Sequence, residues 1–310
     1  MRKKPLDFQS SVQSRIENAV VFPAVTWLCT GNTTTLMQTN LIRVHALFYR
    51  VAALGGLCLL GAVPGCLAAE PSTAALARYS AYVDAQEHRL AQQHRARAGF
   101  VVLTGSADAG ARLHRGELVV ESMTPGDSRD LPGAMLHHWR ATAFVPGATA
   151  ADLERVLRDV AAYPRLYAPQ VVQARVVAQQ GDRFRTSMRL RQKHVLTVVL
   201  DMDYDVAFVW LDPSHGYSLA RSTRVAEIAD AGTASEHALS PGDDHGFLWR
   251  QNTYWSYAEA DGGLYLQIES VSLTRTIPTG LGWALRPFVE SVPRESLEFT
   301  LRSTLGALHK

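Results

Sequence analysis

Three polar side chains near the C-terminus have the types that acid–base chemistry requires. Residues 247–260 and 264–274 alternate in hydrophobicity like the two strands of a hairpin, which would place Tyr254 opposite Glu269 with Arg250 on the same side. If they pointed into a cavity, the three could orient a carbonyl or carboxylate group and transfer a proton. If they pointed outward, they would form surface pairs or a seat for an N-terminal helix. The aromatic character of the opposite face favours the outward orientation.

The other face of this hairpin mixes aromatic and aliphatic side chains with a few polar ones. Asp261-Gly262 is typical of a two-residue turn, which fixes the register by pairing Ala260 with Gly263. Such a mixture suits a pocket for a hydrophobic small molecule. The predicted ligand contacts are Trp249, Gln251, Thr253, Trp255, Tyr257, Ile268 and Ser270. The alternative is that the aromatic members only pack in the core.

Asp201, Asp203 and Asp205 form a run of alternating carboxylates. A hard cation requires about six or more oxygen ligands that converge on one point, whereas alternate residues of a strand spread along one face. A short loop before this strand would place Arg185 opposite Asp201 and Arg183 opposite Asp203. We therefore predict a solvated stripe of ion pairs and no metal site.

The histidines have no partners at helical or hairpin spacing. Asp243-Asp244-His245 lies in a glycine-flanked loop where we expect a turn, and His194 is isolated. His137 and His138 are adjacent, so on a strand they would point to opposite faces. The sequence carries no serine–histidine–acid order, phosphate-binding loop or nucleotide-binding glycine pattern. We predict no cofactor, no metal and no catalytic base here.

The elements that must position these residues begin at residue 134. Residues 135–145 indicate a strand that ends at Pro146-Gly147, and Thr149 caps a short helix over 150–160. Pro293 starts a C-terminal helix with one leucine stripe. Between the helices lie six β-like stretches, at 171–179, 183–191, 195–210, 217–230, 247–260 and 264–274. The pattern predicts an α+β fold, with a curved antiparallel sheet wrapped around a long C-terminal helix on its aromatic face.

An N-terminal segment, residues 72–132, precedes this domain. Residues 72–98 carry apolar side chains at helical spacing behind a Ser-Thr capping pair. The runs 100–104 and 117–123 are β-like and are joined by a glycine- and alanine-rich link. We predict an N-terminal helix and a short hairpin that brace a domain spanning 134–310.

The beginning of the chain carries an export signal. Residues 1–36 resemble neither a signal peptide nor a packed element, and we predict a non-structural upstream extension that leaves Met1 and Met37 open as starts. Residues 37–68 have the basic start, apolar centre and small-residue exit of a secretory signal peptide, with cleavage after Ala68. The apolar run is shorter than the roughly 20 residues of a membrane span. Lipidation at Cys66, in a sequence that resembles a bacterial lipoprotein box, is the alternative.

The composition is that of a globular protein, with 47% hydrophobic and 19% charged residues. All three cysteines (Cys29, Cys58 and Cys66) precede Ala68, so the exported domain would have no disulfide, thiol nucleophile or cysteine metal ligand. The formal net charge is +2, and six of the 31 basic residues but only two of the 29 acidic ones precede the cleavage site. The slight basicity therefore belongs to the leader, and the domain has no electrostatic basis for nucleic-acid binding.

The order of elements resembles the START-like helix-grip (SRPBCC) superfamily, which includes lipid-transfer domains, birch-pollen-allergen proteins and polyketide cyclases. The resemblance covers residues 134–309. It is carried by Phe144-Val145-Pro146-Gly147 and the following helix, by Tyr163-Pro164 and by Pro169-Gln170-Val171. Gly246 to Trp255, Ile277 to Trp283 and Arg286-Pro287-Phe288 resemble an exported bacterial branch of that superfamily.

The resemblance implies a cavity between the sheet and the C-terminal helix, suited to a hydrophobic ligand. We therefore expect a periplasmic or extracellular protein that binds or carries a hydrophobic small molecule or lipid without chemistry. One alternative is a cyclase- or dehydratase-like enzyme acting on a bound aromatic or ketide substrate, with Arg250 and Glu269 facing inward. Another is a non-catalytic envelope interaction module whose cavity is filled by its own side chains. The sequence identifies no specific ligand, protein partner or oligomeric state.

Overall fold

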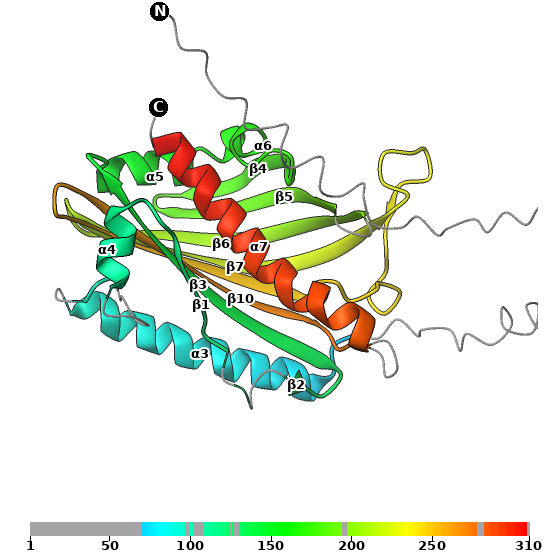
Figure 1. Cartoon of the computed structure of the whole chain (residues 1–310). Coiled ribbons are helices and arrows are strands. Elements are labelled where there is room, and N and C mark those ends of the chain that lie inside the picture. Colours follow the sequence, from blue (N-terminus) through cyan, green and yellow to red (C-terminus); the bar gives the residue numbers. More distant parts are fainter. Residues whose placement is uncertain are drawn as a thin grey trace, which may run out of the picture. The chain divides into compact units, whose positions relative to one another are not determined.

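Alternation of apolar and polar residues along the chain produces one large antiparallel sheet (Figure 1). Its strand order is β1-β3-β10-β9-β7-β6-β5-β4, with β2 paired to β3 and β8 paired to β7. The strands are β1 Val119–Ser122, β2 Asp130–Leu131, β3 Ala134–Pro146, β4 Val171–Gln180, β5 Arg183–Lys193, β6 Thr197–Asp212, β7 His215–Ala229, β8 His237–Ala238, β9 Arg250–Ala260 and β10 Gly263–Arg275.

This computed structural model describes residues 70–96, 99–101, 108–124, 126, 130–193, 197–277 and 282–308, with the backbone alone for 282–290. The predicted upstream extension, the signal peptide with Cys66, and His194 lie outside the described residues. Part of the predicted strand at 100–104 also lies outside them, and Phe100 and Val101 are not in a strand.

Two long helices cover opposite faces of the sheet (Figure 1). Helix α7, Gly282–Leu308, places Leu301 in a core cluster with Trp255, whereas helix α3, Thr73–Arg95, places Tyr79 in a second cluster with Tyr254. Because Tyr254 and Trp255 are neighbours on β9, they point to opposite faces. The sheet wrapped around a long C-terminal helix confirms the predicted helix-grip fold. The division into a brace over 72–132 and a domain from 134 stays a prediction.

The shorter helices connect the sheet at its ends. Helix α5, Ala150–Arg158, begins with the expected cap, since the Thr149 hydroxyl accepts from the Asp152 amide at 3.2 Å and the Asp152 carboxylate accepts from the Thr149 amide at 3.1 Å. It is followed by η1, Val160–Ala162, and α6, Tyr163–Leu166. Helix α4, Ala109–His114, occupies part of the glycine- and alanine-rich link and was not predicted.

The C-terminal helix starts earlier than predicted. We expected it to begin at Pro293, but α7 begins at Gly282 and Pro293 lies inside it. Proline is typical of a first helical turn because it has no amide hydrogen to donate. Packing of the long helix against the sheet, through Leu297 and Leu301, accounts for a helix that tolerates one lost backbone bond.

One predicted hairpin register is correct and the other is wrong. Between β9 and β10, Gly263 pairs with Ala260 around the predicted turn at Asp261-Gly262, where φ is 53° and 73°. Between β5 and β6, Arg185 pairs with Asp205 and not with Asp201. The strands run further than expected, to Lys193 paired with Thr197, which shifts the register by an even number of residues. Each side chain of β5 and β6 therefore lies on the predicted face of the sheet, although its partner on the neighbouring strand is a different residue.

A substitution at Gly263 can test how closely the β9–β10 hairpin packs against β3. A Cβ atom there would overlap the Val145 carbonyl oxygen and lie 2.7 Å from Cζ of Phe144. We expect Gly263→Ala to lower the free energy of unfolding by about 1–3 kcal/mol, measured by urea denaturation, because the backbone of β3 must move.

Gly306→Ala is the matched control, because Gly306 is exposed in α7 and no heavy atom lies within 4 Å of its added Cβ. It should stabilise the protein by about 0.5–1 kcal/mol through helix propensity. Equal effects of the two substitutions would contradict this account of the packing.

Candidate functional site

A cavity of about 970 Å³ lies between α7 and the inner face of the sheet. Its floor comes from alternate residues of strands β5, β6, β7, β9 and β10, and α7 contributes Val292, Ser296 and Phe299. Most of the lining is aliphatic or aromatic, with hydroxyl and amide groups among it. The size and chemistry suit an apolar molecule with a few polar groups.

The two ends of the cavity differ. The end near α5 is lined by Leu157, Phe184 and Phe208, and the Arg158 guanidinium lies over the Phe208 ring at 4.5 Å from its centroid. The opposite end is lined by Asp243, Asp244, His245, Phe247 and Arg275. Asp243, His245 and Phe247 are also exposed, so the cavity reaches solvent at this second end.

A hydrogen-bonded chain crosses the cavity floor. The Tyr204 hydroxyl donates to Oε1 of Gln251 at 2.9 Å, and Nε2 of Gln251 donates to the Ser270 hydroxyl at 3.4 Å. These side chains come from β6, β9 and β10. Burial raises the pKa of Tyr204 well above its usual value, so its hydroxyl stays protonated and remains a donor.

The structure divides the predicted ligand contacts into two groups. Gln251, Thr253, Trp255 and Ser270 line the cavity, whereas Trp249, Tyr257 and Ile268 do not.

The second group has core roles. Trp249 packs in the cluster beneath α3, and its indole N–H donates to Asp244 at 3.2 Å. The Tyr257 hydroxyl donates to Glu154 at 3.2 Å, and Ile268 is buried in the α7 cluster. For Tyr257 and Ile268, alternation gave the correct face but did not separate cavity wall from core, whereas for Trp249 the predicted face was wrong.

Sequence reasoning missed the wall formed by β5 and β6. The side chains from these strands that line the cavity are Phe184, Thr186, Met188, Leu190, Gln192, Val198, Leu200, Tyr204, Val206 and Phe208. The signal was present, because these positions alternate along the two strands. Tyr163 and Tyr167, from the helical segment before β4, complete this side of the cavity.

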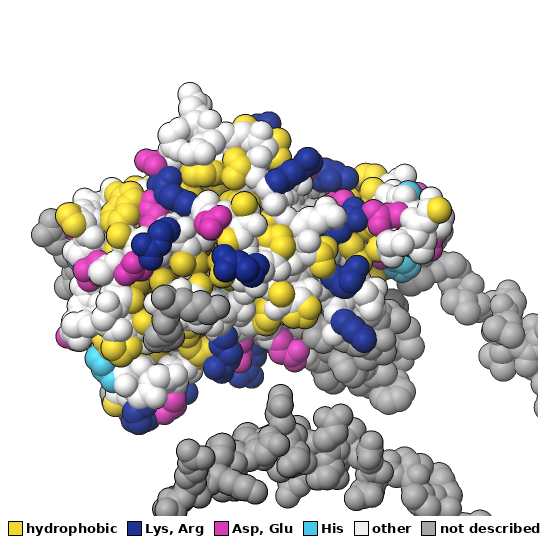
Figure 2. Space-filling model, turned by 90° about the horizontal axis from the view of Figure 1, so that it is seen from above, with side chains coloured by type: hydrophobic (Ala, Val, Ile, Leu, Met, Phe, Trp, Pro, Cys, Tyr) yellow, Lys and Arg dark blue, Asp and Glu magenta, His cyan; other side chains and the backbone are white. Residues whose placement is uncertain are grey.

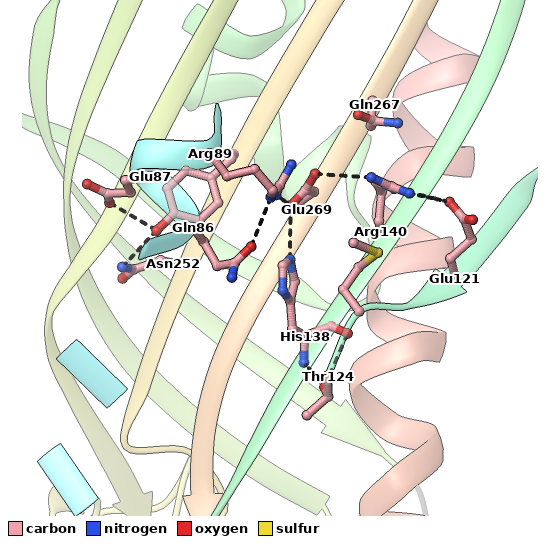
Figure 3. A network of polar contacts seen from close by, with 12 residues as sticks. Gln86, Glu87, Arg89, Glu121, Thr124, His138, Arg140, Asn252, Gln267 and Glu269 are labelled. Atoms are coloured by element: carbon pink, nitrogen blue, oxygen red, sulfur yellow. Dashed lines mark hydrogen bonds and ion pairs between the residues drawn. The ribbon is translucent and has the colours of Figure 1, made fainter. Parts of the chain in front are cut away.

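The polar cluster of Arg250, Tyr254 and Glu269 does not face the cavity. Tyr254 and Glu269 are 2% exposed and lie beneath α3, where Glu87 and Arg89 contact them (Figure 3). Arg250 instead donates to the Trp249 carbonyl at 2.7 Å. Of the two outward interpretations, the structure matches a seat for the N-terminal helix and not an exposed surface pair.

Glu269 is the centre of this interface network. His138 Nε2 lies 2.9 Å from its Oε2, Arg89 binds the same oxygen, and Nη1 of Arg140 lies 3.9 Å from its Oε1 (Figure 3). Arg140 also donates to Glu121 at 2.9 Å and 3.0 Å. Burial by itself would raise the pKa of Glu269, but the hydrogen bond from His138 and the neighbouring positive charges outweigh it and lower this pKa. A charged carboxylate is thus buried between α3 and the sheet.

The remaining charged candidates form ion pairs. Arg189 lies 2.7 Å from Asp201, Arg224 lies 3.8 Å from Asp203, and Nδ1 of His245 lies 2.7 Å from Glu227. Charged side chains of both signs are interspersed with apolar ones on the face seen in Figure 2. Among the residues that the structure describes, no group of three or more His, Cys, Asp or Glu side chains could hold a metal ion. The aspartate stripe is a set of ion pairs, with different partners from those predicted.

Comparisons with known proteins find distant structural likenesses. No family model matches the chain, and no curated protein matches it. The solved structures that resemble it include TTHA0849 from Thermus thermophilus (17% identity, TM-score 0.39, 55% of this chain and 94% of that one). A second is the Zhui aromatase/cyclase from Streptomyces sp. R1128, with 15% identity and a TM-score of 0.39 over 56% of this chain and 94% of that one. A third is a STAR-related lipid transfer protein fragment from Xanthomonas axonopodis, with 18% identity and a TM-score of 0.36 over 58% of this chain and 96% of that one.

The strand order and the position of α7 define a helix-grip fold, as the sequence predicted. This fold is shared by carriers and enzymes, so the function has to be argued from the cavity. None of the helices in the described part of the chain is long and apolar enough to cross a bilayer.

The α3 interface predicts how stability depends on pH. His94 stacks on Tyr217 with ring centroids 4.1 Å apart and lies 2.8 Å from the Ser256 hydroxyl, and burial lowers its pKa to about 4. An unfolded chain takes up this proton near pH 6.5. Unfolding therefore becomes easier as the pH falls from 7 to 5, by about 2 kcal/mol for His94 alone. Burial also lowers the pKa of His138, which acts in the same direction.

The measurement is the free energy of urea unfolding between pH 7 and pH 5. His94→Phe keeps an aromatic ring for the stack and should flatten the pH dependence by roughly the contribution of His94. His88→Phe, at an exposed position of the same helix, is the control and should leave the slope unchanged. The same slope in wild type and His94→Phe would contradict the proposed role of burial.

Proposed function

We propose that this protein binds and carries a hydrophobic small molecule or lipid in the cell envelope, without performing chemistry on it. The observation that carries the proposal is the cavity of about 970 Å³ with a mainly apolar lining. A cavity of this size loses dispersion contacts and stability unless something occupies it. Filling by an apolar ligand is favourable, because burial contributes about 25 cal/mol per Å² of apolar surface.

The enzyme alternative finds less support in the described cavity. A cyclase- or dehydratase-like reaction requires an acid or base positioned against the substrate. Glu269 and Tyr254 lie on the opposite face of the sheet, beneath α3. The carboxylates and histidine among the described lining residues, Asp243, Asp244 and His245, lie at the solvent end. The module with a filled cavity is not favoured either, because the space between α7 and the sheet is open.

The envelope location rests on the leader. The basic start, apolar centre and small-residue exit of residues 37–68 support export, and the absence of cysteine after Cys66 leaves the domain independent of disulfides. Expression with the native leader, followed by intact-mass measurement of the envelope fraction, should give a chain that begins at Ala69. A mass starting at Cys66 with added acyl chains would indicate the lipoprotein alternative, and an intact leader would contradict export.

Occupation of the cavity can be tested with pyrene, an uncharged hydrocarbon. Trp255 lines the cavity, so bound pyrene should quench tryptophan emission by energy transfer. Thr253 lies on the floor between Ala220 and Ser270, its partners on the neighbouring strands. Thr253→Trp should weaken pyrene binding about tenfold, because the indole occupies the space of the ligand.

Thr223→Trp is the control, because Thr223 is exposed on β7 and lies outside the cavity lining. It should bind pyrene as the wild type does. If wild-type protein fails to bind pyrene, or if both tryptophan variants bind it equally, the carrier function is wrong. Organic extraction of protein recovered from the envelope would then identify the class of natural ligand.

A further inference from the structure

A row of five polar side chains crosses the inner face of the sheet, and all of them except Ser222 line the apolar cavity. The strand registers align Thr186 on β5 with Tyr204 on β6, and Tyr204 with Ser222 on β7. The Ser222 hydroxyl accepts a hydrogen bond from the backbone N–H of Gln251 on β9 at 2.9 Å. Gln251 is in turn aligned with Ser272 on β10. Five neighbouring strands thus present a hydrogen-bonding side chain at the same level.

The two ends of this row have unused hydroxyl groups. Thr186 and Ser272 are 3% and 4% exposed, and both line the cavity. Neither hydroxyl has a hydrogen-bond partner among the described residues, whereas Tyr204 and Gln251 bond to each other at 2.9 Å. Neither oxygen is among the buried polar atoms without a partner, so both hydroxyls are open to the cavity and can donate to and accept from a molecule inside it.

Charged side chains are kept away from this row. In the described lining, Asp243, Asp244, His245 and Arg275 lie at the solvent end, and the row itself contains hydroxyl, phenol and amide groups only. An ionised group placed over the row would lose its hydration without gaining an opposite charge. Hydroxyl and carbonyl oxygens, by contrast, can pair with the members of the row that line the cavity.

We propose that the ligand is a neutral hydrophobic molecule that carries hydroxyl or carbonyl oxygens, and that Thr186, Ser272 and the Tyr204–Gln251 pair bind those oxygens. This inference rests on the proposed carrier function and defines the class of its ligand. Thr186 and Ser272 are four strand spacings apart, roughly 19 Å at about 4.8 Å per strand. One small group therefore reaches only one of the two hydroxyls, and a ligand that uses both must be elongated.

Three probes with one ring system separate the alternatives. Pyrene has no oxygen, 1-pyrenemethanol has one neutral hydroxyl, and 1-pyrenecarboxylate is an anion. Titrated by quenching of tryptophan emission, wild-type protein should bind pyrenemethanol about three- to tenfold more tightly than pyrene, since one hydrogen bond is gained. It should bind the carboxylate more weakly than the alcohol.

The double variant Thr186→Val/Ser272→Ala removes both free hydroxyls with little change in volume. We expect it to bind pyrene like the wild type and to lose at least half of the free-energy preference for pyrenemethanol, the rest being due to Tyr204 and Gln251. Thr186→Ser/Ser272→Thr keeps both hydroxyls and should keep the preference, which separates hydrogen bonding from a change in shape.

The outcomes distinguish this inference from the function on which it rests. If pyrene binds but the alcohol gains nothing, or if the preference survives in the valine–alanine variant, the free hydroxyls are not ligand contacts and the inference is wrong. If the carboxylate binds most tightly, the ligand is not neutral. If none of the three probes binds, the carrier function itself fails.

Discussion

The burial of Glu269 between α3 and the sheet is the interaction on which the other parts depend. A carboxylate that is 2% exposed is unfavourable unless opposite charges and hydrogen bonds surround it, and Arg89 of α3 supplies one of them. The next residue on β10, Ser270, points to the cavity. A slip of β10 by one residue would place the carboxylate in the apolar cavity and the serine under α3. The ion cluster therefore specifies both the seat of α3 and the side chains of the cavity floor.

The cavity follows from the width of the sheet. One helix contacts only part of a broad, curved surface, and α7 packs most closely where Leu297 and Leu301 meet the β3–β10 region. The strands further along the sheet, β5 and β6, line the cavity, and β5 reaches α7 through Gln192, which donates to Ser296 at 3.1 Å. Close packing throughout would have been more stable, because each void forfeits dispersion energy. The unfilled volume is consistent with a site shaped for a ligand.

Local patterns predicted the fold better than the site. The Asp261-Gly262 turn determined the register of β9 and β10, and alternation gave the correct faces of these two strands and of β5 and β6. It could not say which inward residues meet α7 and which meet the cavity, because that depends on where the helix crosses the sheet. Trp255 and Tyr257 share a face and differ only in that respect. The buried state of Glu269 was also out of reach, since it requires α3, which is about 180 residues away in sequence. Proline was misleading at Pro293, where tertiary packing outweighs a local signal.

The two faces of the sheet use polarity in different ways. Under α3, full charges are neutralised by neighbours within the protein, although Oε1 of Glu269 has no hydrogen-bond partner among the described residues there. Over the cavity, the hydroxyls of Thr186 and Ser272 are neutral and open to a bound molecule. Charges on the cavity floor would have bound counter-ions and water, and an apolar ligand could displace these only at a large desolvation cost. Neutral groups cost less to desolvate, and they let hydrogen bonding discriminate among hydrophobic molecules of similar shape.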